Sequence, residues 1–233
     1  MRIRNRQLLA FAMILLCSGL ASAYLYRLTH TSWMSYREGL NFFSEHRFTE
    51  AIPALSFAID HGIRRSDAFM SLADSFMATQ RFAEALDTYE ALLRIDAEHA
   101  LALWKTAGLY EQFGRFGDAI QRTRHLLELR PDDPAVLLRM ARLLKFTGQW
   151  DAAIRYYSRL FSGDPLRPHI ASELAEIYAW KGEDAKAIEW FRYALSADPT
   201  DAQTRIRLAR ILFWSGHPEE AISEYIRALG EST

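Results

Sequence analysis

The chain has 233 residues, of which 50% are hydrophobic and 24% are charged. An apolar fraction of this size can build a continuous core and excludes a disordered chain. The 28 basic and 29 acidic residues nearly balance. Because nucleic-acid binding usually requires a basic surface, we expect no nucleic-acid partner.

The first 30 residues predict a membrane anchor with a short connector. Arg2, Arg4 and Arg6 precede an uncharged run over residues 7–26. A helix of that length spans about 30 Å, the thickness of the bilayer core. The preceding arginines place the N-terminus in the cytoplasm by the positive-inside rule. We therefore expect a single-pass protein of the bacterial inner membrane whose remaining residues, 31–233, lie in the periplasm.

A cleaved secretory signal explains the same residues. The apolar stretch from Leu8 to Leu20 is followed by Ala21, Ser22 and Ala23, which form a small-residue cleavage site. Under both interpretations, the rest of the chain is exported from the cytoplasm. We favour the uncleaved anchor because the apolar run is longer than a typical signal core, and whether residues 1–23 are removed stays open.

From residue 32 onward, small residues recur with a period of 34 residues. One series is Gly39, Ala73, Ala107, Ala141, Ala175 and Ala209. A second series is Ala51, Ala85, Ala119, Ala153, Ala187 and Ala221. An unbroken period of this length predicts a solenoid, in which each unit buries its apolar face against its neighbours.

We number each repeat from 1 to 34, beginning at Ser32, so that the two small series occupy positions 8 and 20. Position 24 is mostly aromatic or apolar, and position 32 is proline at Pro131, Pro165 and Pro199. This pattern resembles the tetratricopeptide repeat (TPR) over residues 32–233. The resemblance implies an all-α, right-handed superhelix of about six helix-turn-helix repeats. Their expected ranges are 32–65, 66–99, 100–133, 134–167, 168–201 and 202–233.

We expect about twelve short, antiparallel helices in the repeats, and local signals mark their ends. Position 15 is glycine in the last four repeats, where a left-handed conformation can end the first helix. Asp133 precedes Pro134 and is expected to cap the next helix, and Asp201 is expected to do the same in the last repeat.

No catalytic or metal-binding pattern is present in the sequence. None of the seven histidines is three or four residues from another, so no helical turn presents a pair of histidine ligands. There is no phosphate-binding glycine loop, and no serine has the glycine-flanked context of a hydrolase. We therefore expect neither an enzyme nor a cofactor.

The resemblance implies a concave groove lined by the first helix of each repeat. The lysine and asparagine clamp that grips C-terminal carboxylates in one branch of the family is absent from positions 5 and 9. The candidate groove residues are Trp104, Arg142, Lys145, Phe146, Trp180, Arg210 and Trp214.

Two features of these groove candidates suggest ligands. Phe146, Trp180 and Trp214 share position 13. The last two stand in the phrases Ala179-Trp180-Lys181-Gly182 and Trp214-Ser215-Gly216, which resemble the Ala-Trp-x-Gly phrase in the helical repeats of bacterial exopolysaccharide export proteins. Such rings could bind sugars or apolar peptides, or could simply wedge between hairpins. Arg142, Lys145 and Arg210 could form a basic patch for an acidic partner, or a solvated face.

The last predicted helix, over residues 218–229, is a candidate interface. Ile222, Tyr225, Ile226 and Leu229 leave apolar surface on it, and no polar capping helix follows in the sequence. The alternative is that its polar residues let the helix stand without a partner.

The function that we expect is a non-catalytic periplasmic scaffold, tethered by residues 7–26, that assembles other envelope proteins. Exopolysaccharide synthesis or export, with a possible polysaccharide contact, is the most specific expectation. The alternatives are an adaptor that presents client proteins, as in cytochrome c maturation, and a regulatory subunit of a membrane enzyme.

Overall fold

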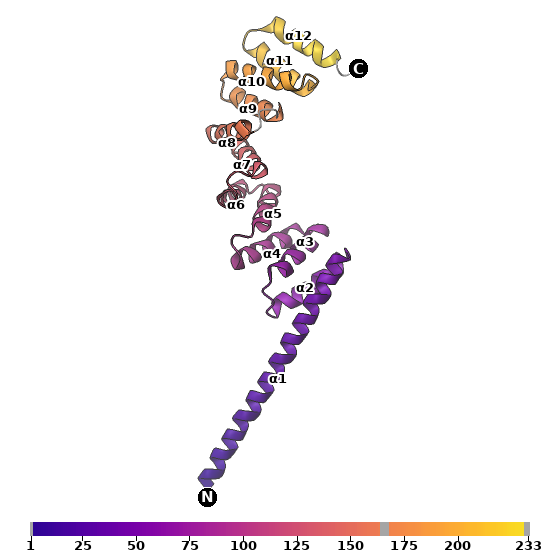
Figure 1. Cartoon of the computed structure of the whole chain (residues 1–233), viewed down its shortest axis with the longest axis vertical. Coiled ribbons are helices and arrows are strands. Elements are labelled where there is room, and N and C mark those ends of the chain that lie inside the picture. The colour runs from indigo at the N-terminus through magenta and orange to yellow at the C-terminus, as the bar shows by residue number, and fades with distance from the viewer. Residues whose placement is uncertain (1, 164–167, 231–233) are drawn as a thin grey trace. The chain divides into compact units, whose positions relative to one another are not determined.

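The computed structural model describes residues 2–163 and 168–230. This part of the chain is all-helical, and it forms twelve helices and no strand, as the sequence predicts (Figure 1). The helices are α1 (Arg2–Ser44), α2 (Phe48–Asp60), α3 (Ser66–Ala78), α4 (Phe82–Ile95), α5 (Ala100–Gln112), α6 (Phe116–Leu129), α7 (Pro134–Phe146), α8 (Trp150–Gly163), α9 (Pro168–Trp180), α10 (Asp184–Ala197), α11 (Ala202–Trp214) and α12 (Pro218–Gly230). Pro165, the proline expected at the end of the fourth repeat, lies outside the described residues.

The chain divides into two compact units, Met1–Leu109 and Tyr110–Thr233, with the boundary inside α5. In the first unit α1 packs on α2 and α3 packs on α4. In the second unit the pairs are α7 with α8, α9 with α10 and α11 with α12. Each pair is a helical hairpin of the kind that the 34-residue period predicts.

The N-terminal helix differs from the expected division at residue 30. α1 is continuous from Arg2 to Ser44, so the segment predicted to be an anchor and the first helix of repeat 1 form one element without a connector. Neither proline nor a glycine cluster interrupts this stretch, so nothing local ends the helix. In the part of the chain that the structure describes, no helix combines the length and the hydropathy that a membrane crossing requires.

The small residues lie where the two helices of a hairpin cross. Every alanine of the two series is buried, with an exposed fraction of 0% or 1%. At Gly39, an added Cβ would lie only 2.6 Å from Cγ of Leu55. The predicted reason for the small series, close helix crossing, is therefore confirmed.

The turns confirm the predicted helix-ending glycines. Gly114, Gly148, Gly182 and Gly216 all have φ between 70° and 87°. In the first two repeats the same position holds His46 and Gln80, which also adopt positive φ, at 59° and 61°. The helix cap is thus formed in all six repeats, although only four supply the residue that favours it.

The two predicted N-caps are also present. The carboxylate of Asp133 accepts hydrogen bonds from the backbone N–H groups of Ala135 and Val136, with Pro134 at the start of α7. Asp201 accepts one from the N–H of Thr204. Each bond satisfies a backbone donor that the first turn of a helix leaves free.

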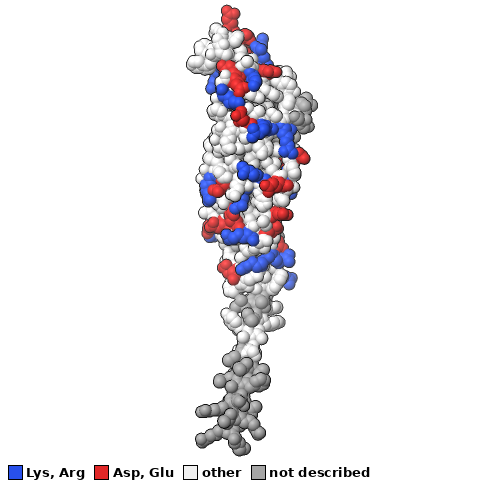
Figure 2. All heavy atoms as spheres, turned by 90° about the vertical axis from the view of Figure 1, so that its left-hand side faces the viewer, with Lys and Arg blue, Asp and Glu red and all other residues white. Residues whose placement is uncertain are grey.

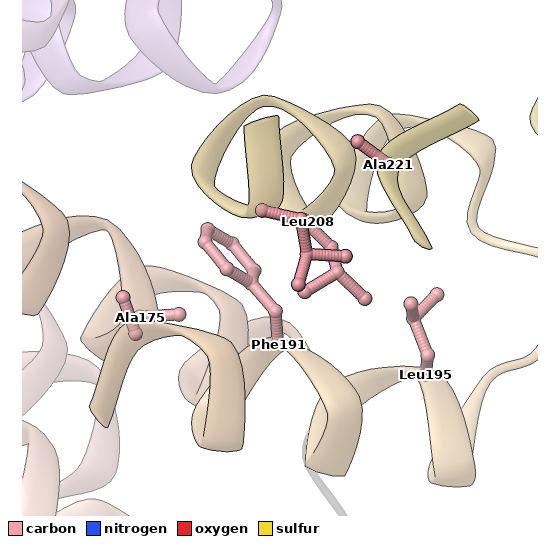
Figure 3. Close-up of a cluster of buried hydrophobic side chains, with 7 residues drawn as sticks. Ala175, Phe191, Leu195, Leu208 and Ala221 are labelled. Carbon is pink, nitrogen blue, oxygen red and sulfur yellow. The ribbon is translucent and has the colours of Figure 1, made fainter. Parts of the chain in front are cut away.

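A core cluster joins four consecutive helices of the second unit, α9 to α12. Phe191 of α10 points toward Leu208 of α11, and Leu195 lies one turn further along α10 (Figure 3). Phe191 is 1% exposed and Leu208 is 2% exposed. Ala175, Ala187, Leu212 and Ala221 complete the cluster. This core fixes α9, α10 and α11 against each other, which positions the site described next.

Candidate functional site: a hollow and a charge network on the first helices

A hollow of about 280 Å³ opens between α9 and α11 in the second unit. Its lining combines apolar and charged side chains: Glu176, Ala179, Trp180, Phe191, Arg207, Arg210 and Ile211. All except Phe191 come from α9 and α11, the first helices of their hairpins. A concave site with a mainly apolar wall and a few polar groups is the usual form of a binding site.

One end of the hollow is held by ion pairs. Glu176 of α9 lies 3.1 Å from Nη1 of Arg207 on α11 and 2.9 Å from Nζ of Lys145 on α7. The carboxylate therefore joins three successive first helices. Because Arg207 and Lys145 both form ion pairs with Glu176, this end of the hollow is polar but its net charge is close to zero.

Glu173 is the centre of the adjoining network. Nζ of Lys145 donates to its carboxylate, Nε of Arg142 does so at 3.2 Å, and the hydroxyl of Tyr157 donates at 2.9 Å. Burial alone raises the pKa of Glu173, but these donors and charges outweigh it and hold that pKa below its ordinary value. Burial, together with the nearby Glu173 carboxylate, raises the pKa of Tyr157. Glu173 is therefore ionised and Tyr157 neutral at neutral pH.

Opposite charges 31 residues apart link successive first helices. In the second unit, position 9 pairs with position 6 of the next repeat in Arg142–Glu173 and in Glu176–Arg207. In the first unit, Asp74 pairs in the same way with Lys105, at 2.5 Å. The order of the charges is reversed in Arg142–Glu173 relative to the other two pairs, which disfavours an exchange of partners between that pair and the others.

Two of the three basic residues that could form a patch are paired with acidic residues. Lys145 and Arg142 face Glu173 and Glu176, which neutralise them. The sequence alone does not show this pairing, because the two acidic residues come from the next hairpin. Arg210 is exposed and takes part in no ion pair within the described residues. Trp104 belongs to the first unit and is half-buried on α5.

The position-13 rings are exposed, and each has a different environment. Phe146 is 69% exposed, Trp180 52% and Trp214 77%. Phe146 packs on Phe116 at a centroid distance of 4.4 Å. Nζ of Lys145 lies 5.5 Å from the ring of Trp180. Of the three rings, only Trp180 lines the hollow. Their exposure disfavours the interpretation that they are wedges buried between hairpins.

The predicted C-terminal interface residues lie on one side of α12. Ile222, Ile226 and Leu229 are exposed at 58%, 63% and 71%, while Tyr225 is half-buried. The apolar surface that the sequence indicated is therefore present. Whether a partner covers it stays a prediction.

Glu173, Arg207, Glu176 and Ile211 belong to the site but are not among the candidates that the sequence indicated. The 31-residue spacing of opposite charges was a usable signal for the first three. Nothing in the sequence distinguishes Ile211 from a core residue. Among the described residues, no group of acidic, histidine or cysteine side chains could hold a metal ion. The chemistry that the hollow offers is recognition: apolar contact, cation–π contact and hydrogen bonding.

Charge of both signs is spread over the molecular face shown in Figure 2, where basic and acidic side chains alternate. Such a surface provides no extended field of one sign to attract a polyanion. The repeated small-residue hairpins, together with the hollow between α9 and α11, define an α-solenoid of the protein-binding class.

The comparisons with known proteins identify the family. The tetratricopeptide repeat family matches residues 36–98, 70–134 and 138–202, and a second family with the same description matches residues 182–231. These matches span well over half of the sequence, so the chain belongs to the tetratricopeptide repeat family. No curated protein is similar enough in sequence to count as a relative.

Several solved structures share the fold. MamA (residues 41 to the end) from Desulfovibrio magneticus RS-1 is 16% identical, with a TM-score of 0.66, over 73% of this chain and 96% of that chain. YrrB, described as a TPR protein with an unusual peptide-binding site, is 16% identical, with a TM-score of 0.63, over 76% of this chain and 92% of that chain. A tetratricopeptide repeat protein from Parabacteroides merdae ATCC 43184 is 16% identical, with a TM-score of 0.67, over 87% of this chain and 80% of that chain. At these identities the likeness concerns the fold alone.

Proposed function

We propose that the chain is a non-catalytic scaffold that recruits another protein by binding one of its peptide segments in the hollow between α9 and α11. The observation that carries this proposal is the composition of the lining. Trp180, Ala179 and Ile211 form an apolar wall, and Arg210 lies beside it with its charge available. An apolar side chain next to a carboxylate would satisfy both features.

The solvent exposure of Trp180 supports this proposal. Trp180 is 52% exposed, and Lys145 lies against its ring, so the side chain is oriented without being covered. Aromatic side chains that are held in place in this way commonly contribute much of the binding energy at protein interfaces, because they bury a large area at a small entropic cost. YrrB, with a similar fold, is described as binding peptide.

The finer proposal is that this scaffold serves an envelope complex in the periplasm and is tethered by residues 7–26. Arg2, Arg4 and Arg6 before the uncharged run support this topology. A role in exopolysaccharide synthesis or export is supported by the Ala-Trp-x-Gly phrase and by the exposure of Trp180 and Trp214. Those two indoles also favour polysaccharide as the second candidate ligand.

The test compares two tryptophan variants of the full chain, Trp180→Ala and Trp214→Ala. Trp180 lines the hollow, and Trp214 is a matched exposed tryptophan outside it. Each protein is affinity-purified from detergent-solubilised membranes, and the co-purifying proteins are quantified by mass spectrometry. We expect one or more partners to fall about tenfold with Trp180→Ala and to stay unchanged with Trp214→Ala.

Affinity electrophoresis through gels that contain an uncharged polysaccharide tests the second candidate ligand. Retardation that both variants lose would assign the position-13 rings to sugar binding. If all co-purifying proteins survive Trp180→Ala in a folded protein, the hollow is not the recruitment site.

A further inference from the structure

The outer face of α12 carries apolar residues that the next hairpin covers elsewhere in the chain. At position 28, Leu195 of α10 is 9% exposed because α11 packs over it, whereas Leu229 of α12 is 71% exposed. At position 21, Ile188 is half-buried against the same cluster, and Ile222 is 58% exposed. The surface of α12 thus has the form of a helix-packing face.

One residue on this face departs from the pattern of the repeats. Position 25 is polar in the first five repeats, where it is Ser56, Glu90, Arg124, Ser158 and Arg192. In the last repeat it is Ile226, which is 63% exposed. Ile222, Ile226 and Leu229 then follow the spacing of four and three residues that forms a continuous helix-packing seam. The substitution adds apolar surface at a position that is polar in the other repeats.

A polar pair of residues beside this seam indicates which side chain a binding partner would place there. Repeats 4 and 6 both have arginine at position 9 and tyrosine at position 24, Arg142 with Tyr157 and Arg210 with Tyr225. In repeat 4 this pair holds Glu173, at position 6 of the next first helix. The distances are 3.2 Å from Nε of Arg142 and 2.9 Å from the hydroxyl of Tyr157. In repeat 6 the same pair forms no such contact within the described residues.

We propose that the outer face of α11 and α12 binds an amphipathic helix of a partner protein. The apolar stripe of that helix covers Ile222, Ile226 and Leu229. A glutamate on the same helix is held by Arg210 and Tyr225, as Glu173 is held by Arg142 and Tyr157. The partner is not a second copy stacked head to tail, because its position 6 in repeat 1 is Arg37, and two arginines would repel each other.

The probe for this face is a fluorescein-labelled, helix-stabilised peptide with the sequence of α9, residues 168–180. This sequence already carries Glu173 and the apolar residues Ile170, Leu174 and Ile177, which are buried in the folded chain. Binding to the full chain is followed by fluorescence polarisation. We expect the affinity to fall about tenfold with a Glu173→Gln peptide, and by at least as much when the chain carries Ile226→Asp.

A charge exchange tests the predicted pairing directly. A chain with Arg210→Glu should bind the Glu173→Lys peptide more tightly than the unmodified peptide, which reverses the order seen with the natural chain. Trp180→Ala serves as the control, because Trp180 lines the hollow and not this face. The control variant should retain full binding, so failure of this proposal and failure of the hollow as a recruitment site can be distinguished.

Three outcomes would overturn the proposal, provided that circular dichroism shows the variants to be folded. The first is equal binding by the Ile226→Asp chain, which would mean that the peptide binds elsewhere, for example by displacing α9 itself. The second is no binding, or equal affinity for the Glu173→Gln peptide. The third is self-association of the chain that Ile226→Asp abolishes, which would make a second copy the occupant of this face.

Discussion

Single residues decide how closely the two helices of each hairpin approach. Ala175 at position 8 and Ala187 at position 20 belong to one buried cluster with Phe191. Both are 0% exposed, so a larger side chain at either position has no solvent to enter. Tight packing of this kind cannot relax without moving a helix.

The variant Ala187→Leu should therefore lower the free energy of unfolding by about 1–3 kcal/mol, because it overpacks the crossing. Lys186→Leu replaces the adjacent side chain, which is 59% exposed. This variant should change the free energy of unfolding by no more than about 0.5 kcal/mol. Thermal melting followed by circular dichroism compares the two. Equal losses at both positions would show that the small residue is not required at the crossing.

Individual helices are linked by charges as well as by apolar packing. Glu173 of α9 accepts hydrogen bonds from Lys145 and Arg142 of α7 and from Tyr157 of α8. Because these contacts favour the ionised form, the pKa of Glu173 is lower in the folded chain than in the unfolded chain. The unfolded chain then takes up more protons in acid. The stability that Glu173 contributes is present above its ordinary pKa and is lost as the pH falls through the lower, folded value.

The pH dependence of stability tests this assignment. Glu173→Gln should reduce the free energy of unfolding by about 1–3 kcal/mol at pH 7, since it removes hydrogen bonds to a charged group. The difference between the variant and the natural chain should shrink as the pH falls below about 4.3, the ordinary pKa of glutamate. Urea unfolding at several pH values measures both effects. Glu189→Gln, at an exposed position of α10, provides the control, and a constant difference at all pH values would contradict the role of Glu173.

The whole molecule combines a repeat scaffold with an N-terminal segment of different composition. The scaffold exposes two surfaces in its second unit, the hollow beside Trp180 and the seam on α12. The two surfaces share Arg210 and otherwise consist of different residues, so one chain could recruit more than one protein. The proposed compartment rests on residues 2–26, whose arginines precede the uncharged run.

We expect a periplasmic reporter to be active when it is fused after Thr233. In this test, alkaline phosphatase, which requires an oxidising compartment, is compared with a cytoplasmic reporter at the same position. Exchange of Arg2, Arg4 and Arg6 for glutamate should reduce the phosphatase activity, because the positive-inside signal is lost. An inactive phosphatase together with an active cytoplasmic reporter would reverse the proposed orientation.

The sequence by itself determined the helical hairpins, their period and their local ends. Asp133 and Asp201 cap helices as predicted, and the position-15 glycines adopt the predicted left-handed conformation. These features could be predicted because they depend on the backbone conformation of consecutive residues. His46 and Gln80 show the limit of such signals. Their positive φ follows from the hairpin that contains them and not from their own preference.

Only the tertiary structure decided which side chains meet across hairpins. From the sequence, Lys145 and Arg142 could form a basic patch. In the structure, Glu173 and Glu176 from the next hairpin neutralise them. Of the three position-13 rings, only Trp180 lines the hollow. Such outcomes depend on the distance and rotation between helices about 31 residues apart, which are fixed by core packing around residues such as Phe191. Periodicity identifies the face of a helix on which a residue lies, whereas packing determines its neighbours.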